Sequence, residues 1–163
     1  MIDKYGYSET AASEIVTMQY MITAILLPIL GAMVDRTGNI IWYVIAGGIL
    51  RLSANIIQIM IPDCDNACSI SMLPYIIDGV SYAIFMGIYF TCIAYLVEPK
   101  LQSTAYGINS CFLNTGITIL PPFVGLIHDK TPNIGQGYFW VYVLFILLSV
   151  ISLSLKITLK FWD

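Results

Sequence analysis

The strongest constraint in this sequence is a series of long apolar segments separated by short polar connections. A helix that crosses a bilayer needs about 20 mostly apolar residues, because each residue advances about 1.5 Å through a hydrocarbon core about 30 Å thick. Five segments meet this requirement, at about residues 15–34, 40–61, 70–97, 104–127 and 138–155. The sequence therefore predicts an all-α, polytopic membrane helix bundle of five transmembrane helices in a single domain, residues 1–163.

Composition excludes several other classes of protein. Hydrophobic residues make up 58% of the 163 residues and charged residues only 10%, and the mean hydropathy is +0.82. A soluble domain is about a quarter charged. The net charge of -3 has the wrong sign for binding a phosphate backbone. We therefore expect neither a soluble enzyme, nor a disordered tail, nor a nucleic-acid-binding protein.

Residues for catalysis are scarce. The sequence contains one histidine and no arrangement of a nucleophile with histidine, no phosphate-binding loop and no cluster of metal ligands. We predict no enzyme activity, no cofactor and no metal site.

Cys64 and Cys68 share the short loop after the second segment. An oxidising compartment would allow a disulfide there, while a metal site would need more ligands than this loop offers.

Basic residues predict the orientation in the membrane. Five spans place the two termini on opposite sides, and cytoplasmic loops carry an excess of Lys and Arg. One side has Arg36, Lys100, Lys156 and Lys160, and the other has Lys4 and Lys130. We therefore expect an outside amino terminus and a cytoplasmic carboxyl terminus. An odd number of spans with an outside amino terminus suggests that further spans precede Met1.

The loop after the first segment reads GAMVDRTG, residues 31–38. Gly31 would let a neighbouring helix approach closely, and Gly38 would allow a sharp reversal. Asp35 could face the amino-terminal dipole of an adjacent helix. Arg36 could bind an acidic residue at another helix end or a lipid phosphate.

This pattern, G-x-x-x-D-R-x-G between two spans, resembles the loop motif of the major facilitator superfamily. YGYSETAASEI (5–15), VEPKLQSTAYG (97–107) and GLIHDKT (125–131) extend the resemblance to the lysosomal dipeptide transporters of that family. The family carries the motif between helices 2 and 3 and again between helices 8 and 9. Four spans follow it here, so the resemblance implies helices 8–12, the carboxyl-terminal part of a twelve-helix fold.

The resemblance implies a function and several partners. The chain would be part of a uniporter that exports dipeptides from lysosomes by alternating access, in the lysosomal membrane and with its amino terminus lumenal. Its partners would be the lipid bilayer, the missing amino-terminal half, the dipeptide and a glycosylated lysosomal accessory protein. Two alternatives stay open: a carrier of monocarboxylates or other organic anions, and a non-transporting half-bundle subunit.

In the family, the first, third and fourth segments would line the transport cavity. Amides and phenols suit peptide substrates because they hydrogen-bond peptide groups without demanding one side chain. The same side chains could instead make hydrogen bonds between helices. The substrate-binding candidates are Gln19, Tyr20, Thr23, Tyr82, Tyr89, Asn109 and Asn114.

Charged residues supply two further expectations. Arg51 lies near the middle of the second segment, where an unpaired arginine costs about 2.5–3.5 kcal/mol on insertion scales. We expect an ion pair with Asp78, with a substrate contact as the alternative. We also hypothesise that Arg36 pairs with Glu98 when the cytoplasmic gate is closed, while Asp35 faces the start of the fourth segment. The alternative is that Arg36 and Glu98 are solvated surface charges.

Overall fold

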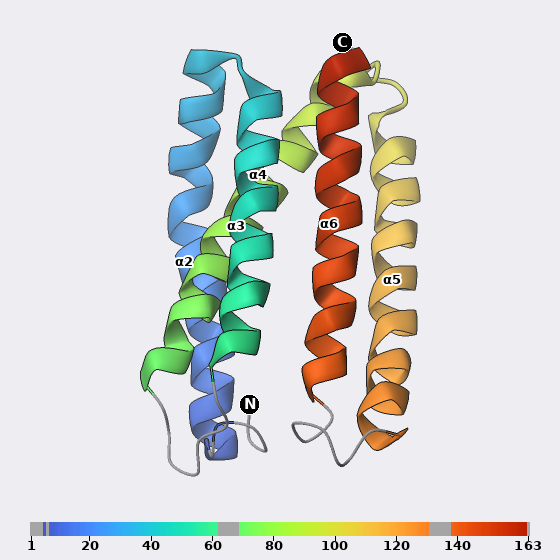
Figure 1. The fold of residues 1–163 in the computed structure, drawn as a ribbon. Coiled ribbons are helices and arrows are strands. Elements are labelled where there is room, and N and C mark those ends of the chain that lie inside the picture. The colour runs from blue at the N-terminus through green and yellow to red at the C-terminus, as the bar shows by residue number, and fades with distance from the viewer. Residues whose placement is uncertain (1–4, 6, 62–68, 131–137, 163) are drawn as a thin grey trace. The chain divides into compact units, whose positions relative to one another are not determined.

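The chain folds into a set of long helices (Figure 1). A computed structural model describes residues 5, 7–61, 69–130 and 138–162, and no strand occurs among them. The helices are α2 (Glu9–Thr37), α3 (Ile40–Met60), the short 3₁₀ helix η1 (Ser69–Ser71), α4 (Met72–Leu96), α5 (Gln102–Lys130) and α6 (Tyr138–Trp162). Five helices among the described residues are long and apolar enough to cross a membrane. The predicted all-α class is confirmed.

Local sequence sets the two ends of α2. The hydroxyl of Ser8 accepts a hydrogen bond from the Ala11 N–H at 3.3 Å, and Glu9 places a negative charge in the first turn. Both features stabilise a helix amino terminus, so α2 begins before its apolar run. At the other end Gly38 has a φ of 66°, and its N–H donates to the Val34 carbonyl at 2.9 Å. This left-handed cap ends α2 just before α3 starts.

The described chain divides into two compact units. The first comprises residues 1–88 and 142–163, and the second comprises residues 89–141. The boundaries fall inside α4 and α6, so each of these helices contributes residues to both units.

In the first unit, the residues before α2 pack on the ends of α3 and α4. Tyr5, Tyr7, Ile15 and Ile61 form a buried cluster. The hydroxyl oxygen of Tyr7 lies 3.0 Å from that of Ser71, and Tyr5 is fully buried. Burial of these aromatic rings holds the chain entering α2 against the helices that follow it.

Two neighbouring glycines let α3 pack closely on two partners. A Cβ at Gly47 would lie 3.0 Å from the side chain of Ile84 on α4, and one at Gly48 would lie 3.0 Å from Leu153 on α6. The Ser81 hydroxyl also donates to the Gly47 carbonyl at 2.8 Å. Small residues commonly permit such close helix packing in membranes.

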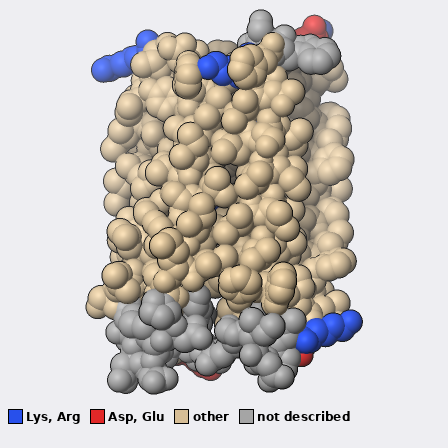
Figure 2. Space-filling model, in the orientation of Figure 1, with Lys and Arg blue, Asp and Glu red and all other residues tan. Residues whose placement is uncertain are grey.

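Large apolar side chains are exposed on the described helices. On the face drawn in Figure 2, Lys, Arg, Asp and Glu lie near the helix ends, with uncharged residues between them. In the most apolar stretch of α5 no residue is buried. Such surfaces are typical of helices that contact lipid or further protein.

Candidate functional site

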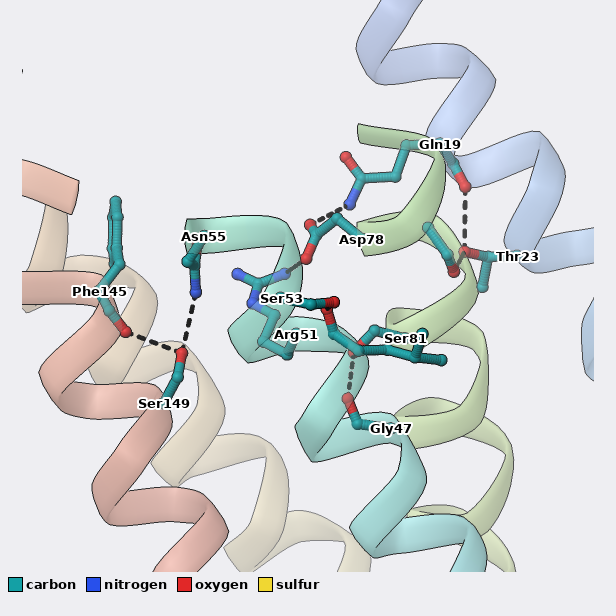
Figure 3. A network of polar contacts seen from close by, with 12 residues as sticks. Gln19, Thr23, Gly47, Arg51, Ser53, Asn55, Asp78, Ser81, Phe145 and Ser149 are labelled. Carbon is teal, nitrogen blue, oxygen red and sulfur yellow. Dashed lines mark hydrogen bonds and ion pairs between the residues drawn. The ribbon is translucent and has the colours of Figure 1, made fainter. Parts of the chain in front are cut away.

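The first unit contains a polar network that joins three helices (Figure 3). Arg51 on α3 forms an ion pair with one carboxylate oxygen of Asp78 on α4. The side-chain amide of Gln19 on α2 donates to the other oxygen at 2.7 Å. The Asp78 side chain is 15% exposed, so one half-buried carboxylate connects all three helices.

Thr23 lies one turn beyond Gln19 and strengthens the contact between α2 and α4. Its hydroxyl donates to the Gln19 carbonyl at 3.0 Å and approaches the Gly79 carbonyl at 3.3 Å. A Cβ at Gly79 would lie 3.3 Å from the Gln19 carbonyl oxygen. The absence of a side chain at Gly79 therefore lets the two helix backbones approach.

A second contact links α3 to α6 in the same unit. The amide of Asn55 donates to the Ser149 hydroxyl at 2.9 Å, and that hydroxyl donates to the Phe145 carbonyl at 2.7 Å (Figure 3). Asn55 is buried. This pair satisfies polar groups that would otherwise lie unbonded in an apolar environment.

Tyr20 and Tyr82 bring α2 and α4 together through their rings. The ring centroids lie 6.2 Å apart in an edge-to-face arrangement with an interplanar angle of 81°. Tyr20 is exposed and Tyr82 is half-buried. Four of the seven substrate-binding candidates thus lie in the first unit, on the facing sides of these two helices.

The second unit holds another polar series, between the last turns of α4 and the start of α5. The amide of Gln102 donates to the Ala94 carbonyl at 3.0 Å, and the Tyr106 hydroxyl donates to the Phe90 carbonyl at 3.1 Å. One helical turn deeper, the Tyr89 hydroxyl donates to the Asn109 side-chain oxygen. The structure therefore joins two substrate-binding candidates that lie 20 positions apart in the sequence.

Asn109 has an unusual environment. Its side chain is buried, and its amide nitrogen has no hydrogen-bond partner among the described residues. Asn114, the remaining candidate, is exposed on α5. The two amides therefore differ in what surrounds them, although both lie within one membrane-crossing helix.

The loop motif lies at the end of α2. Asp35 and Arg36 are exposed. Apart from the neighbouring backbone of α2 itself, no described atom lies within 4 Å of a Cβ built at Gly31. Glu98 is exposed in the connection between α4 and α5 and belongs to the other unit. The close approach at Gly31 and the pairing of Arg36 with Glu98 stay predictions. Cys64 and Cys68 lie outside the described residues.

Several contacts were not anticipated from the sequence. Gln102, Tyr106 and Asn109 recur at helical spacing, so they share one face of α5, and that spacing was the available signal. Asn55 and Ser149 are separated by 94 positions and offer no such pattern. In the described part of the chain, no three His, Cys, Asp or Glu side chains gather where they could hold a metal ion.

The sequence profile of the Major Facilitator Superfamily matches residues 1–161. The chain is similar to the lysosomal dipeptide transporter MFSD1 of Bos taurus (31% identical) and of Homo sapiens (32% identical), each over 154 residues that cover 94% of this chain and 30% of the relative. The Danio rerio protein of that name is 26% identical over 163 residues, covering 99% of this chain and 33% of the relative. The chain thus spans about a third of the length of these relatives. No solved structure matches it.

Proposed function

Because the chain belongs to the major facilitator superfamily, we propose that it forms part of a membrane transporter that carries dipeptides by alternating access. The family is one of transporters and is not an enzyme class. The five apolar helices of membrane-crossing length in the described part of the chain support a multi-pass membrane protein. We assign to it the carboxyl-terminal helices 8–12 of the family fold, which face an amino-terminal half.

The balance of polar groups inside the spans carries the proposal. Arg51 and Asp78 neutralise each other, so the network leaves no net charge on these two residues. The other candidate groups are neutral amides, hydroxyls and phenols. A dipeptide is a zwitterion with one peptide group, and such neutral groups can bind its N–H and carbonyl without selecting one side chain.

The named relatives support the substrate and the location. The similar proteins of Bos taurus and Homo sapiens are lysosomal dipeptide transporters. We propose export from the lysosome as a uniporter, with the lysosomal membrane as the site of action. We further propose a glycosylated lysosomal membrane protein as accessory partner, which co-purification with the full-length protein would test.

Charge distribution supports an orientation. Because successive spans alternate in direction, Arg36, Lys100 and the carboxyl-terminal lysines share one side, which we propose is cytoplasmic. The amino terminus would then be lumenal. On this side we propose that Arg36 and Glu98 pair in the state closed to the cytoplasm, with Asp35 facing the start of α5.

The arrangement of Arg51 bears on the anion-carrier alternative. A carrier of monocarboxylates would need a cationic side chain available to its substrate, and Arg51 is the candidate within the described spans. Its guanidinium instead lies on the Asp78 carboxylate. This pairing makes the guanidinium less available to an anionic solute and so argues against the anion carrier.

Uptake by proteoliposomes tests the proposal. The full-length protein that carries this segment would be reconstituted and given labelled dipeptide, with a labelled monocarboxylate and protein-free liposomes as controls. We expect saturable dipeptide uptake without monocarboxylate uptake. Uptake of the monocarboxylate alone would favour the anion carrier, and uptake of neither would favour a non-transporting subunit.

A further inference from the structure

The side-chain amide of Asn109 has one end bonded and one end unbonded. Its oxygen accepts a hydrogen bond from the Tyr89 hydroxyl. Its nitrogen is buried and has no partner among the described residues, and the residue as a whole is only 7% exposed. Nearly all buried polar groups in native proteins are hydrogen-bonded, so an exception of this kind calls for an explanation.

The neighbouring contacts of the second unit fix this amide in place. Gln102 and Tyr106, on the same face of α5, both donate to backbone carbonyls of α4. Tyr89 packs edge-to-face on Phe90, with ring centroids 6.2 Å apart, and Phe90 contacts Tyr106 with centroids 5.9 Å apart. The phenol that holds Asn109 is itself held by aromatic packing, which restricts the direction of the amide.

Asn109 lies deeper along α5 than Gln102 and Tyr106. It lies seven positions after Gln102, about 10 Å along α5 from the first helical residue. Gln102 and Tyr106 find carbonyls near the end of α4. At the depth of Asn109, no described acceptor lies within hydrogen-bonding reach of the amide nitrogen.

The chemistry of the free end defines what it can bind. An amide NH₂ is a pure donor, so its complement is an acceptor oxygen and neither a metal ion nor an ammonium group. We propose that the Asn109 amide nitrogen binds an acceptor oxygen of the transported solute, either the peptide carbonyl or the terminal carboxylate of a dipeptide. Tyr89 is a positioning residue that orients this donor. The inference rests on the proposed function and deepens it.

Solute analogues paired with variants test the contact. Uptake efficiency would be measured with the full-length protein in proteoliposomes. The solutes would be a dipeptide, its thioxo analogue, in which sulfur replaces the peptide oxygen, and its decarboxylated analogue, in which hydrogen replaces the terminal carboxylate. The analogue lacking the bound oxygen should be taken up about tenfold less efficiently by the unmutated protein. In Asn109→Leu, uptake of the parent dipeptide should fall. The parent and the analogue should then differ in uptake efficiency by no more than about twofold, because the variant has lost the donor.

Two further variants separate binding from structure. Tyr89→Phe keeps the amide donor but removes the phenol that orients it. The preference for the parent dipeptide over the analogue should fall to about threefold, through a change in KM with kcat unchanged. If Asn109→Leu does not fold, Tyr89→Phe still tests the proposed contact. Asn55→Leu removes a matched buried amide that bonds to Ser149, and should lower the amount of folded protein without changing the preference.

The outcomes distinguish the inference from the proposed function. Dipeptide uptake in which Asn109→Leu and Tyr89→Phe both keep the full preference would overturn the inference and leave the proposed function standing. Equal uptake of both analogues and the parent by the unmutated protein would also overturn it. Absence of dipeptide uptake by the unmutated protein would overturn the proposed function, and with it the inference that rests on it.

Discussion

Arg51 on α3 and Asp78 on α4 form an ion pair inside the membrane-crossing part of the chain, and Gln19 on α2 donates to the second oxygen of the same carboxylate. Three helices therefore depend on one acidic side chain. The carboxylate can accept several hydrogen bonds, whereas an amide in its place could accept at only one oxygen. A change of charge at Asp78 would therefore affect the contacts of all three helices.

Asp78→Asn should destabilise the full-length protein. The variant leaves Arg51 without its counter-charge, and removing one partner of a fully buried pair costs about 3–5 kcal/mol. The Arg51 side chain is 46% exposed, so we expect a smaller loss, about 2 kcal/mol. Thermal unfolding in detergent, followed by tryptophan fluorescence, would measure it.

A double variant supplies the control for this prediction. Arg51→Gln combined with Asp78→Asn removes both charges and keeps polar side chains at both positions. It should recover most of the lost stability, because the cost comes from an uncompensated charge. A double variant as unstable as Asp78→Asn would contradict this account of the pair.

Gly79→Ala should weaken the packing of α2 on α4. The new methyl group would lie 3.3 Å from both the backbone oxygen and the side chain of Gln19. Overpacking of this kind typically costs about 1–3 kcal/mol. Gly87→Ala is the matched control on the same helix, since its methyl group would meet Leu27 at 4.0 Å. We expect Gly87→Ala to be neutral or to stabilise the helix by about 0.5–1 kcal/mol, and equal effects of the two variants would refute the packing argument.

Ser149→Ala should loosen the contact between α3 and α6. The variant removes the acceptor of the buried Asn55 amide, and hydrogen bonds between membrane helices contribute about 0.6 kcal/mol on average. Because the amide is left unbonded, we expect a loss of about 1–2 kcal/mol in unfolding free energy. Ser154→Ala on the same helix removes only an exposed bond to its own helix, and should have almost no effect on the same denaturation curve.

Arg36→Ala tests the proposed gate. If Arg36 pairs with Glu98 when the transporter is closed to the cytoplasm, its loss should shift the protein toward the state open on that side. Labelling of single cysteines placed on the two faces would report the shift, and we expect the labelling rate to change about threefold. Lys100→Ala removes another exposed charge near Glu98 and should leave the labelling unchanged. Unaltered labelling and transport in Arg36→Ala would remove the gating role.

Part of the candidate site could be anticipated from residue chemistry alone. An arginine within an apolar span requires a partner, and Asp78 was the nearest acid on the next span. The structure places the two together. The spacing of Tyr89 and Asn109 gave no comparable reason to pair them, because a neutral phenol and a neutral amide can each bond to many groups.

Segment length and hydropathy are enough to predict that the chain forms long apolar helices, how many of them can cross a membrane, and which connections carry charge. These properties follow from the length and hydropathy of continuous segments, because each segment can be compared on its own with the length needed to cross a bilayer. Which polar groups contact one another depends on the packing of the helices and becomes visible in the three-dimensional structure. The Asn55–Ser149 bond, the contact of Gly79 with Gln19 and the unbonded nitrogen of Asn109 depend on how each helix is rotated against its neighbours. That rotation is set by side-chain packing between distant segments, and no single segment encodes it.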